Sequence, residues 1–218
     1  MAFENRTEAG LLLARRLAEY RGRRPLVLAI PRGAVPMGKI VADALDGELD
    51  VVLVRKLRAP YNPELAIGSI DETGAVYLDP DIRHIVNDAY LEAEKNTQLA
   101  TLRQRRQQYE PAGAPIDAAG RIAIVLDDGI ATGSTMIAAL RAVRARHPTK
   151  LVAATGVASP EALSLISQEA DEVVCLETPL ILYAIGAHFR DFTQVSDEEV
   201  VATLHEARRP RVGSGPDA

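Results

Sequence analysis

The segment with the clearest chemical content contains two adjacent acidic residues, Asp127 and Asp128, followed by Ala-Thr-Gly-Ser-Thr at residues 131–135. Carboxylates accept hydrogen bonds from hydroxyl groups. Small and hydroxyl-bearing residues at the start of a helix leave backbone amides free to hold a phosphate. Two carboxylates would repel a bare phosphate, so the combination favours a sugar phosphate whose hydroxyls need acceptors. A capped helix after a strand would explain the serine and threonines but not the paired aspartates.

The flanking residues predict the elements that present this segment. Residues 121–126 form a largely apolar run that is typical of a central parallel strand, and residues 136–146 are expected to be helical. In an open parallel sheet, ligands bind beyond the carboxyl ends of the strands, where Asp127 and Asp128 emerge. We therefore expect a ligand cleft at this end of the sheet.

Basic residues follow two other expected strands. The apolar run 26–30 stops at residues 31–33 (Pro-Arg-Gly), and the run 51–54 ends in residues 55–58 (Arg-Lys-Leu-Arg). Taken singly, such cations are more often surface charges, and Pro-x-Gly is only a turn signal. Because the carboxyl ends of parallel strands face one crevice, we expect both groups of residues to lie near Asp127 and Asp128.

Strands and helices alternate along the chain, which predicts an α/β fold with a doubly wound, mainly parallel sheet. The 218 residues and the apolar content of 47% fit a single domain, expected over residues 1–207. Residues 208–218 have too few apolar side chains to pack and are expected to be disordered. The other expected elements are a helix over 7–22 capped by Thr7, helices at 35–45, 82–109 and 160–169, and strands at 151–157 and 173–176.

The region between the second strand and the long helix is predicted to cover the cleft. Two prolines in residues 59–63 predict a long loop, and residues 66–71 and 75–78 are expected to form a short antiparallel pair. We expect residues 58–70 to act as a lid. The basic residues of the helix at 82–109 are typical of a solvated helix face.

Charge and composition disfavour several classes of protein. The 25 basic and 30 acidic residues give a formal net charge of -5, which argues against a nucleic-acid or membrane surface. No apolar stretch approaches the roughly 18 residues of a membrane span, and no secretion signal is visible. The single Cys175, expected in a buried strand, excludes an internal disulfide. We therefore expect a cytoplasmic protein.

Residues 124–135 resemble the motif with which type I phosphoribosyltransferases bind 5-phosphoribosyl 1-pyrophosphate (PRPP). In that motif, aliphatic strand residues precede two acidic residues, two variable residues and small-Thr-Gly-x-Thr, and every position matches. The longer stretch 124–143 is particularly similar to adenine phosphoribosyltransferases. The resemblance implies that family's fold with a small hood, here from residues 1–22 and 177–207, and transfer of a phosphoribosyl group from PRPP.

The resemblance also implies roles for individual residues. The residues implied to bind PRPP are Arg32, Gly33, Asp127, Asp128, Gly129, Ala131, Thr132, Gly133, Ser134 and Thr135. Among these, the aspartates would bind the ribose hydroxyls and residues 132–135 the 5-phosphate. The implied catalytic residues are Arg55, Lys56 and Asp128. Residues 31–33 resemble the pyrophosphate loop, which implies a cis peptide bond between Pro31 and Arg32.

The implied reaction sets two physical tasks. Departure of pyrophosphate leaves an oxocarbenium-like sugar, so the leaving anion must be stabilised and water excluded. Mg²⁺ with Arg32, Arg55 and Lys56 is expected to stabilise the leaving anion. Closure of the lid is expected to exclude water. Since magnesium is usually held by substrate phosphates and water, we expect no direct protein ligands.

The sequence leaves the acceptor open beyond a small nitrogenous compound. Relatives that use 6-oxopurines carry an aspartate where Ala131 stands, so hypoxanthine and guanine are disfavoured. Tyr183, His188 and Phe189 are candidate acceptor-binding residues, because they could stack on or hydrogen-bond a base. Packed aromatics and a structural histidine explain the same three residues equally well.

The main alternative is a non-catalytic, PRPP-sensing regulator, because a fold does not decide function. The cations at residues 55–58 favour an enzyme, and the lack of a basic face disfavours a DNA-binding regulator. A Rossmann-like dinucleotide-binding protein would need a Gly-x-Gly-x-x-Gly turn, which residues 31–36 lack. A homodimer is expected as the common state of such enzymes.

Overall fold

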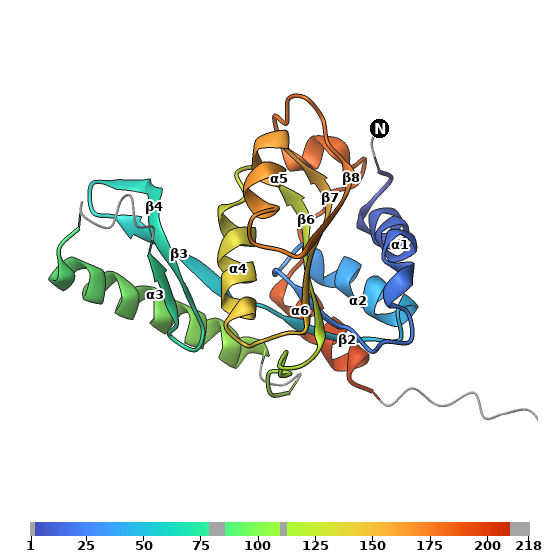
Figure 1. Ribbon diagram of the computed structural model, residues 1–218, viewed down its shortest axis with the longest axis horizontal. Coiled ribbons are helices and arrows are strands. Elements are labelled where there is room, and N and C mark those ends of the chain that lie inside the picture. The colour runs from blue at the N-terminus through green and yellow to red at the C-terminus, as the bar shows by residue number, and fades with distance from the viewer. Residues whose placement is uncertain (1–2, 79–85, 110–112, 210–218) are drawn as a thin grey trace, which may run out of the picture.

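A computed structural model of the chain describes residues 3–78, 86–109 and 113–209. At its centre lies a five-stranded parallel sheet with the strand order β2-β1-β6-β7-β8 (Figure 1). These strands are β1 (Leu26–Ala29), β2 (Glu48–Val51), β6 (Ile122–Ile130), β7 (Lys150–Ala158) and β8 (Glu172–Glu177). All of β1 and nearly all of β6 and β7 are buried, which is why these strands are apolar on both faces.

Helices cover both faces of this sheet. One face carries α1 (Arg6–Arg16), α2 (Ala34–Ala44) and α6 (Asp197–Ala207), and the other carries α4 (Ser134–Arg144) and α5 (Pro160–Ile166) (Figure 1). Each face has its own apolar core, with Leu13 and Met37 in one and Leu140 and Ile166 in the other. In the described part of the chain, the 3-10 helices η1 (Ala18–Tyr20) and η4 (Ile185–His188) complete the body.

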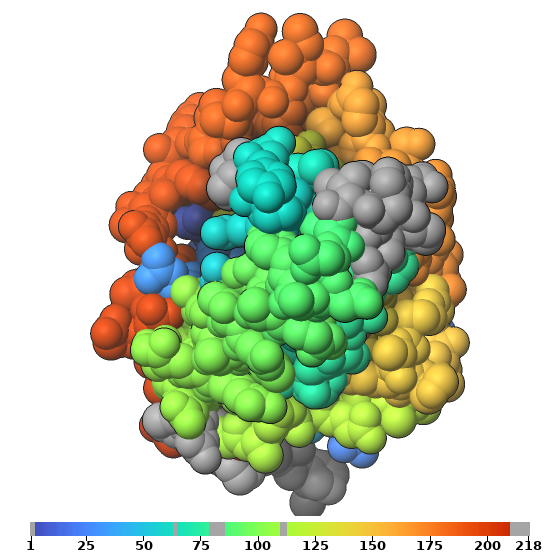
Figure 2. Space-filling view, turned by 90° about the vertical axis from the view of Figure 1, so that its left-hand side faces the viewer, coloured from blue at the N-terminus to red at the C-terminus, as the bar shows by residue number. Residues whose placement is uncertain are grey.

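A second, antiparallel sheet stands beside the main one. It consists of β3 (Val54–Ala59), β4 (Asn62–Asp71) and β5 (Val76–Leu78), and α3 (Asp88–Tyr109) packs against β3 and β4. In Figure 2, which views the molecule from this side, α3 runs across the front face. The predicted fold class, a doubly wound and mainly parallel α/β sheet, is confirmed, and the small antiparallel sheet stands beside it.

The division of the chain into one domain with a hood from residues 1–22 and 177–207 stays a prediction. The expected disorder of residues 208–218 falls mainly on residues 210–218, which lie outside the described part. Arg208 is described: it follows the last residue of α6 and contacts Asp50 at 3.4 Å.

The prediction of a long loop at residues 59–63 is wrong. Ala59 pairs directly with Asn62 across a tight turn, so β3 and β4 form a hairpin. The register between the two strands shifts near Arg58, and Pro63 falls at this irregularity, between the paired residues Asn62 and Ala66. Proline has no backbone N–H and is therefore found at bulges rather than within a regular ladder. The predicted antiparallel pair of β4 and β5 is confirmed, with Ser69 opposite Tyr77.

The predictions for the cap of α1 and for the burial of Cys175 are also wrong. The cap of α1 is Asn5 and not Thr7, because the Asn5 side chain accepts a hydrogen bond from the Glu8 amide at 3.1 Å. Cys175 is only partly buried, because β8 is the edge strand of the main sheet and has a neighbour on one side.

Candidate active site

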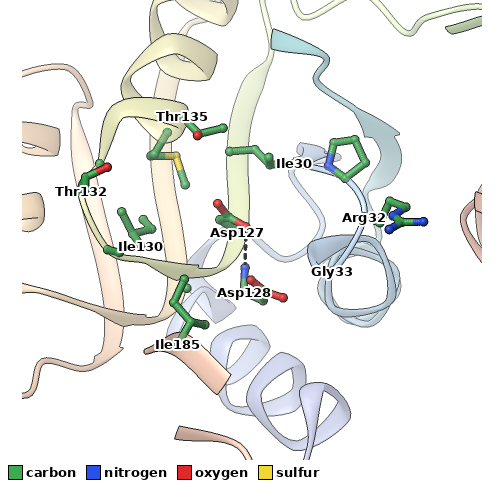
Figure 3. Close-up of a pocket in the computed structure, with 14 residues that line it drawn as sticks. Ile30, Arg32, Gly33, Asp127, Asp128, Ile130, Thr132, Thr135 and Ile185 are labelled. Carbon is green, nitrogen blue, oxygen red and sulfur yellow. Dashed lines mark hydrogen bonds between the residues drawn. The ribbon is translucent and has the colours of Figure 1, made fainter. Parts of the chain in front are cut away.

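A cleft of about 410 Å³ opens at the carboxyl ends of β1 and β6 (Figure 3). These strands pair in parallel with Ala29 opposite Leu126, so the loop after β1 lies beside the end of β6. All the residues predicted to bind PRPP except Ser134 line this cleft, namely Arg32, Gly33, Asp127, Asp128, Gly129, Ala131, Thr132, Gly133 and Thr135. The fold therefore brings two sequence segments almost a hundred residues apart into one cleft wall.

The two aspartates carry negative charge in a setting that disfavours it. The Asp128 amide donates to the Asp127 carboxylate at 2.9 Å, the contact drawn in Figure 3. Burial raises the pKa of Asp127 well above its usual range, and the adjacent Asp128 charge raises it further. Burial also raises the pKa of Asp128, against the opposing effect of Arg6. Hydroxyl donors or a cation bound here would stabilise the ionised form of both carboxyl groups.

Arg6 is a residue of the site that the sequence analysis missed. Its Nε donates to Asp128 Oδ2 at 2.9 Å, and both side chains are 12% exposed. The same guanidinium lies 3.8 Å from the ring centre of Phe192 and donates to the Thr193 carbonyl at 2.7 Å. Arg6 therefore joins α1, the end of β6 and the segment before α6. No local pattern in the sequence marks an arginine in the first turn of a helix for this position.

The turn between β6 and α4 has the form of a phosphate cradle. Gly133 has a φ of 82°, a left-handed conformation that favours glycine, and it precedes α4 without any side-chain cap. The first amides of α4 therefore lack a side-chain partner at the edge of the cleft. Ser159 donates to the Ala131 carbonyl at 2.9 Å and holds the turn, while the hydroxyls of Thr132 and Ser134 lie 3.2 Å apart.

The loop after β1 closes the opposite wall. The peptide bond between Pro31 and Arg32 is cis, which confirms the prediction made for this position. A Cβ atom on residue 33 would lie 2.1 Å from Asp128 Oδ2, so only glycine fits there. The Arg32 guanidinium lies 3.6 Å from Asp197 of α6, and in Figure 3 it points away from the aspartates.

The two predicted basic catalytic residues lie in β3 rather than in a loop after a strand. Arg55 lines a smaller cavity, of about 200 Å³, which shares Ile30, Pro31 and Thr135 with the main cleft. Lys56 follows it in β3 and lines neither of these two cavities. The structure therefore places Arg55 next to the cleft and Lys56 outside its wall.

The predicted acceptor-binding residues do not line the cleft. Phe189 is buried between Phe3 and Phe192, with ring centres 5.2 and 4.9 Å away, and Tyr183 is 88% exposed. The backbone carbonyl of His188 accepts a hydrogen bond from the Phe3 amide at 2.8 Å. Ile185 lines the cleft instead. No local pattern marks this isoleucine, because an aliphatic residue in an irregular segment resembles any core residue.

Ile185 closes over the floor of the cleft. A Cβ on Gly129 would lie 2.2 Å from Ile185 Cγ2, so the glycine lets η4 approach the end of β6. Together with Ile130 and Met136, Ile185 gives the cleft an apolar part beside its charged one.

Among the described residues, no group of three or more His, Cys, Asp or Glu side chains is placed to hold a metal ion. None of the helices in that part of the chain is both long and apolar enough to cross a membrane.

The fold and the site are those of the phosphoribosyltransferase family. Residues 6–188 match the family described as phosphoribosyl transferase domain, and the chain belongs to this family, of the type I class. The motif at residues 124–135 and the cleft around it lie within the matched region.

Individual relatives agree with this assignment. Two Mycobacterium tuberculosis proteins, from strains CDC 1551 and H37Rv, are each named "Putative phosphoribosyl transferase" and are 42% identical over 216 residues. That alignment covers 98% of this chain and 48% of each relative, so the chain spans about half the length of these curated relatives. The crystal structure of TT1426 from Thermus thermophilus is 44% identical, with a TM-score of 0.88, over 94% of this chain and 99% of that one.

Proposed function

We propose that this protein binds PRPP with Mg²⁺ and transfers its phosphoribosyl group to a small nitrogenous acceptor, with release of pyrophosphate. The observation that carries the proposal is the meeting of three features in one cleft. These are the paired carboxylates of Asp127 and Asp128, the uncapped start of α4, and the loop of residues 31–33. A structural pair of aspartates would not need a phosphate cradle beside it.

Each part of PRPP has a complementary part of the cleft. The ribose hydroxyls donate to the carboxylates of Asp127 and Asp128 and stabilise their ionised forms. The 5-phosphate accepts from the amides and hydroxyls of residues 132–135. The pyrophosphate lies toward Arg32 and Gly33, on the side of Arg55.

The reaction moves charge from one end of this cleft to the other. The bond between sugar C1 and the pyrophosphate oxygen breaks, its electron pair leaves with pyrophosphate, and the acceptor nitrogen forms the new bond to C1. The acceptor loses its proton to solvent or to a base. As C1 becomes positive, the Asp128 carboxylate stabilises it, while Arg55 stabilises the leaving anion. Lys56, the next residue of β3, remains a candidate for the same role.

The residues of the cleft fit a magnesium ion that is held mainly by the substrate. Asp127 and Asp128 offer two adjacent carboxyl groups at the cleft wall, and magnesium prefers oxygen ligands. When bound, Mg²⁺ would neutralise part of the pyrophosphate charge. The two carboxylates would contribute to holding the hydrated ion.

For the acceptor we propose a nitrogenous base other than a 6-oxopurine, because Ala131 cannot exchange a proton with it. The apolar part of the cleft at Ile130, Met136 and Ile185 suits the face of a flat ring. Tyr183, His188 and Phe189 remain candidates for acceptor contacts, and a homodimer remains the proposed assembly.

The proposal is tested by incubating the protein with PRPP, Mg²⁺ and a panel of purines, pyrimidines and small amines, and following pyrophosphate release. We expect release that depends on one class of acceptor and is lost in the Asp127→Asn/Asp128→Asn variant. Tight PRPP binding without release for any acceptor would instead identify a PRPP sensor.

A further inference from the structure

The long helix α3 contributes a basic side chain next to the cleft, which its sequence does not reveal. Arg105, near the end of α3, and Arg55 of β3 line the cavity of about 200 Å³ that continues from the cleft past Pro31. This cavity shares Ile30, Pro31 and Thr135 with the cleft. Its volume is several times the ~30 Å³ that one water molecule occupies in the liquid, so it has room for phosphate groups.

The two arginines of this cavity lack a carboxylate bound directly to them among the described residues. Within the described part of the chain, neither Arg55 nor Arg105 forms an ion pair with a carboxylate. Arg55 Nε donates to the neutral Gln98 side chain at 2.6 Å, and Gln98, which is 5% exposed, in turn donates to Glu94 at 3.0 Å. A buried amide therefore orients Arg55 without cancelling its charge.

The positive charges around the cavity also repel one another. Burial lowers the pKa of Arg55 from its ordinary value, and the nearby charges of Arg58 and Arg105 lower it further, although Glu94 partly offsets them. Guanidinium groups that repel one another in a partly dry cavity are stabilised by an anion with several acceptor oxygens. A solvated helix face does not explain Arg105, because its side chain lines a cavity.

We propose that this cavity receives the pyrophosphate group of PRPP and that Arg105 is a PRPP-binding residue. The proposal rests on the proposed function and adds to it that α3 supplies a cation to the leaving group. The cavity opens beside Pro31, where the loop of residues 31–33 begins, so one phosphate can contact Arg55 and Arg105 while the other stays beside that loop.

The test compares Arg105→Met with Arg103→Met, a matched change two positions away on α3. Arg103 is exposed and lines a different cavity with Glu72 and Gln107. Calorimetric titrations in Mg²⁺ use inorganic pyrophosphate, PRPP and ribose 5-phosphate as separate probes. We expect Arg105→Met to weaken pyrophosphate and PRPP binding about tenfold or more, with ribose 5-phosphate changed less than about twofold.

Two further readouts separate a ligand contact from a structural role. Arg105→Lys keeps the charge and should recover part of the pyrophosphate affinity. Without ligand, Arg105→Met should unfold at the same temperature as Arg103→Met or above it, because it relieves repulsion with Arg55.

Several outcomes would overturn the subsite. One is an unchanged affinity of Arg105→Met for pyrophosphate. The others are an equal loss of pyrophosphate affinity in Arg103→Met, or a loss of ribose 5-phosphate affinity in Arg105→Met as large as its loss of pyrophosphate affinity. If the wild-type protein binds PRPP and ribose 5-phosphate, but Arg105→Met binds pyrophosphate and PRPP as tightly as wild type does, only the proposed subsite is wrong. If the wild-type protein binds neither compound, the proposed function fails as well.

Discussion

Asp127 and Asp128 are adjacent in β6 but have different surroundings, which gives them separable roles. Asp128 is tied to Arg6 and faces Gly33, whereas Asp127 has no guanidinium partner among the described residues and accepts from the Asp128 amide. Asp127 is thus the less compensated charge of the pair. We expect a bound hydroxyl or ion to stabilise the Asp127 carboxylate most. In the ligand-free protein, we expect the ionised Asp127 to lower the free energy of unfolding more than Asp128 does.

The first prediction concerns the stability of Asp127→Asn. A carboxyl whose pKa is higher in the folded than in the unfolded state destabilises the fold once it is ionised. Asparagine removes that charge, so the variant should be more stable than wild type by about 1 kcal/mol at pH 8. The gain should shrink as the pH falls toward ~4, where the wild-type carboxyl is protonated too.

Thermal unfolding across this pH range measures the effect, with Asp191→Asn as the control. Hydrogen bonds from Thr193 lower the pKa of Asp191, so its ionised form stabilises the fold and its loss should not raise the unfolding temperature. An Asp127→Asn variant that unfolds below wild type at pH 8 would contradict the account of this carboxylate.

The second prediction concerns Gly33. An alanine Cβ would lie 2.1 Å from Asp128 Oδ2 and 3.0 Å from Arg6 Nη2, so Gly33→Ala must displace the carboxylate or the loop. We expect a loss of about 1–3 kcal/mol in unfolding free energy, together with weaker PRPP binding.

A double-mutant cycle with Asp128→Ala identifies the cause of the Gly33→Ala effect. If the clash is with the carboxylate, Gly33→Ala should cost less in the Asp128→Ala background, by roughly 0.5 kcal/mol or more. Strictly additive losses in denaturant unfolding would show that the clash with Asp128 is not what matters.

At the scale of elements, sequence patterns predicted the main sheet better than the antiparallel one. The strands β1, β6 and β7 are buried on both faces of the sheet, so burial alone accounts for their continuous apolar sequences. In the hairpin, β3 carries charged and half-exposed residues, Pro60 lies in the turn and Pro63 follows it. Its two strands are held together by backbone pairing, between Ala59 and Asn62 and farther along β4. The preferences of single residues do not reveal such pairing.

The hairpin leads to a third prediction, about closure over the cleft. Tyr61 at its turn is 98% exposed, and Arg55 at its base lines the cavity next to the cleft. Binding of PRPP should therefore slow amide hydrogen exchange in residues 58–62, because the bound anion draws β3 toward the cleft. Amides of β8, on the far edge of the main sheet, serve as the control. Equal exchange with and without PRPP at residues 58–62 would argue against a lid.

At the scale of the whole molecule, the site is assembled from parts that are distant in the sequence. The sequence predicted the motif at residues 127–135 and the loop at 31–33, because each follows an apolar strand. It did not predict Arg6, Arg105 or Ile185, which reach the cleft or its neighbouring cavity through helix packing. Contacts such as the one between residues 6 and 128 depend on tertiary packing, for which a local pattern carries no signal.

The packing of α1 and η4 also explains why the cleft is closed on one side. Phe3 forms a β-bridge with Phe189 and packs its ring against that of Phe189 at a tilt, which fixes the N-terminal segment to the segment before α6. Arg6 and Ile185 extend from these two segments to Asp128 and Gly129. The same contacts that complete the apolar core therefore also position the charged wall of the cleft.

The central claim is that Asp127 and Asp128 bind the ribose hydroxyls of PRPP. Calorimetric titration of wild type and Asp127→Asn/Asp128→Asn with PRPP and with inorganic phosphate tests it most directly. We expect the double variant to bind PRPP at least about tenfold more weakly and to bind phosphate nearly as wild type does, because the cradle at residues 132–135 is intact. Equal PRPP affinity in the two proteins would contradict the claim.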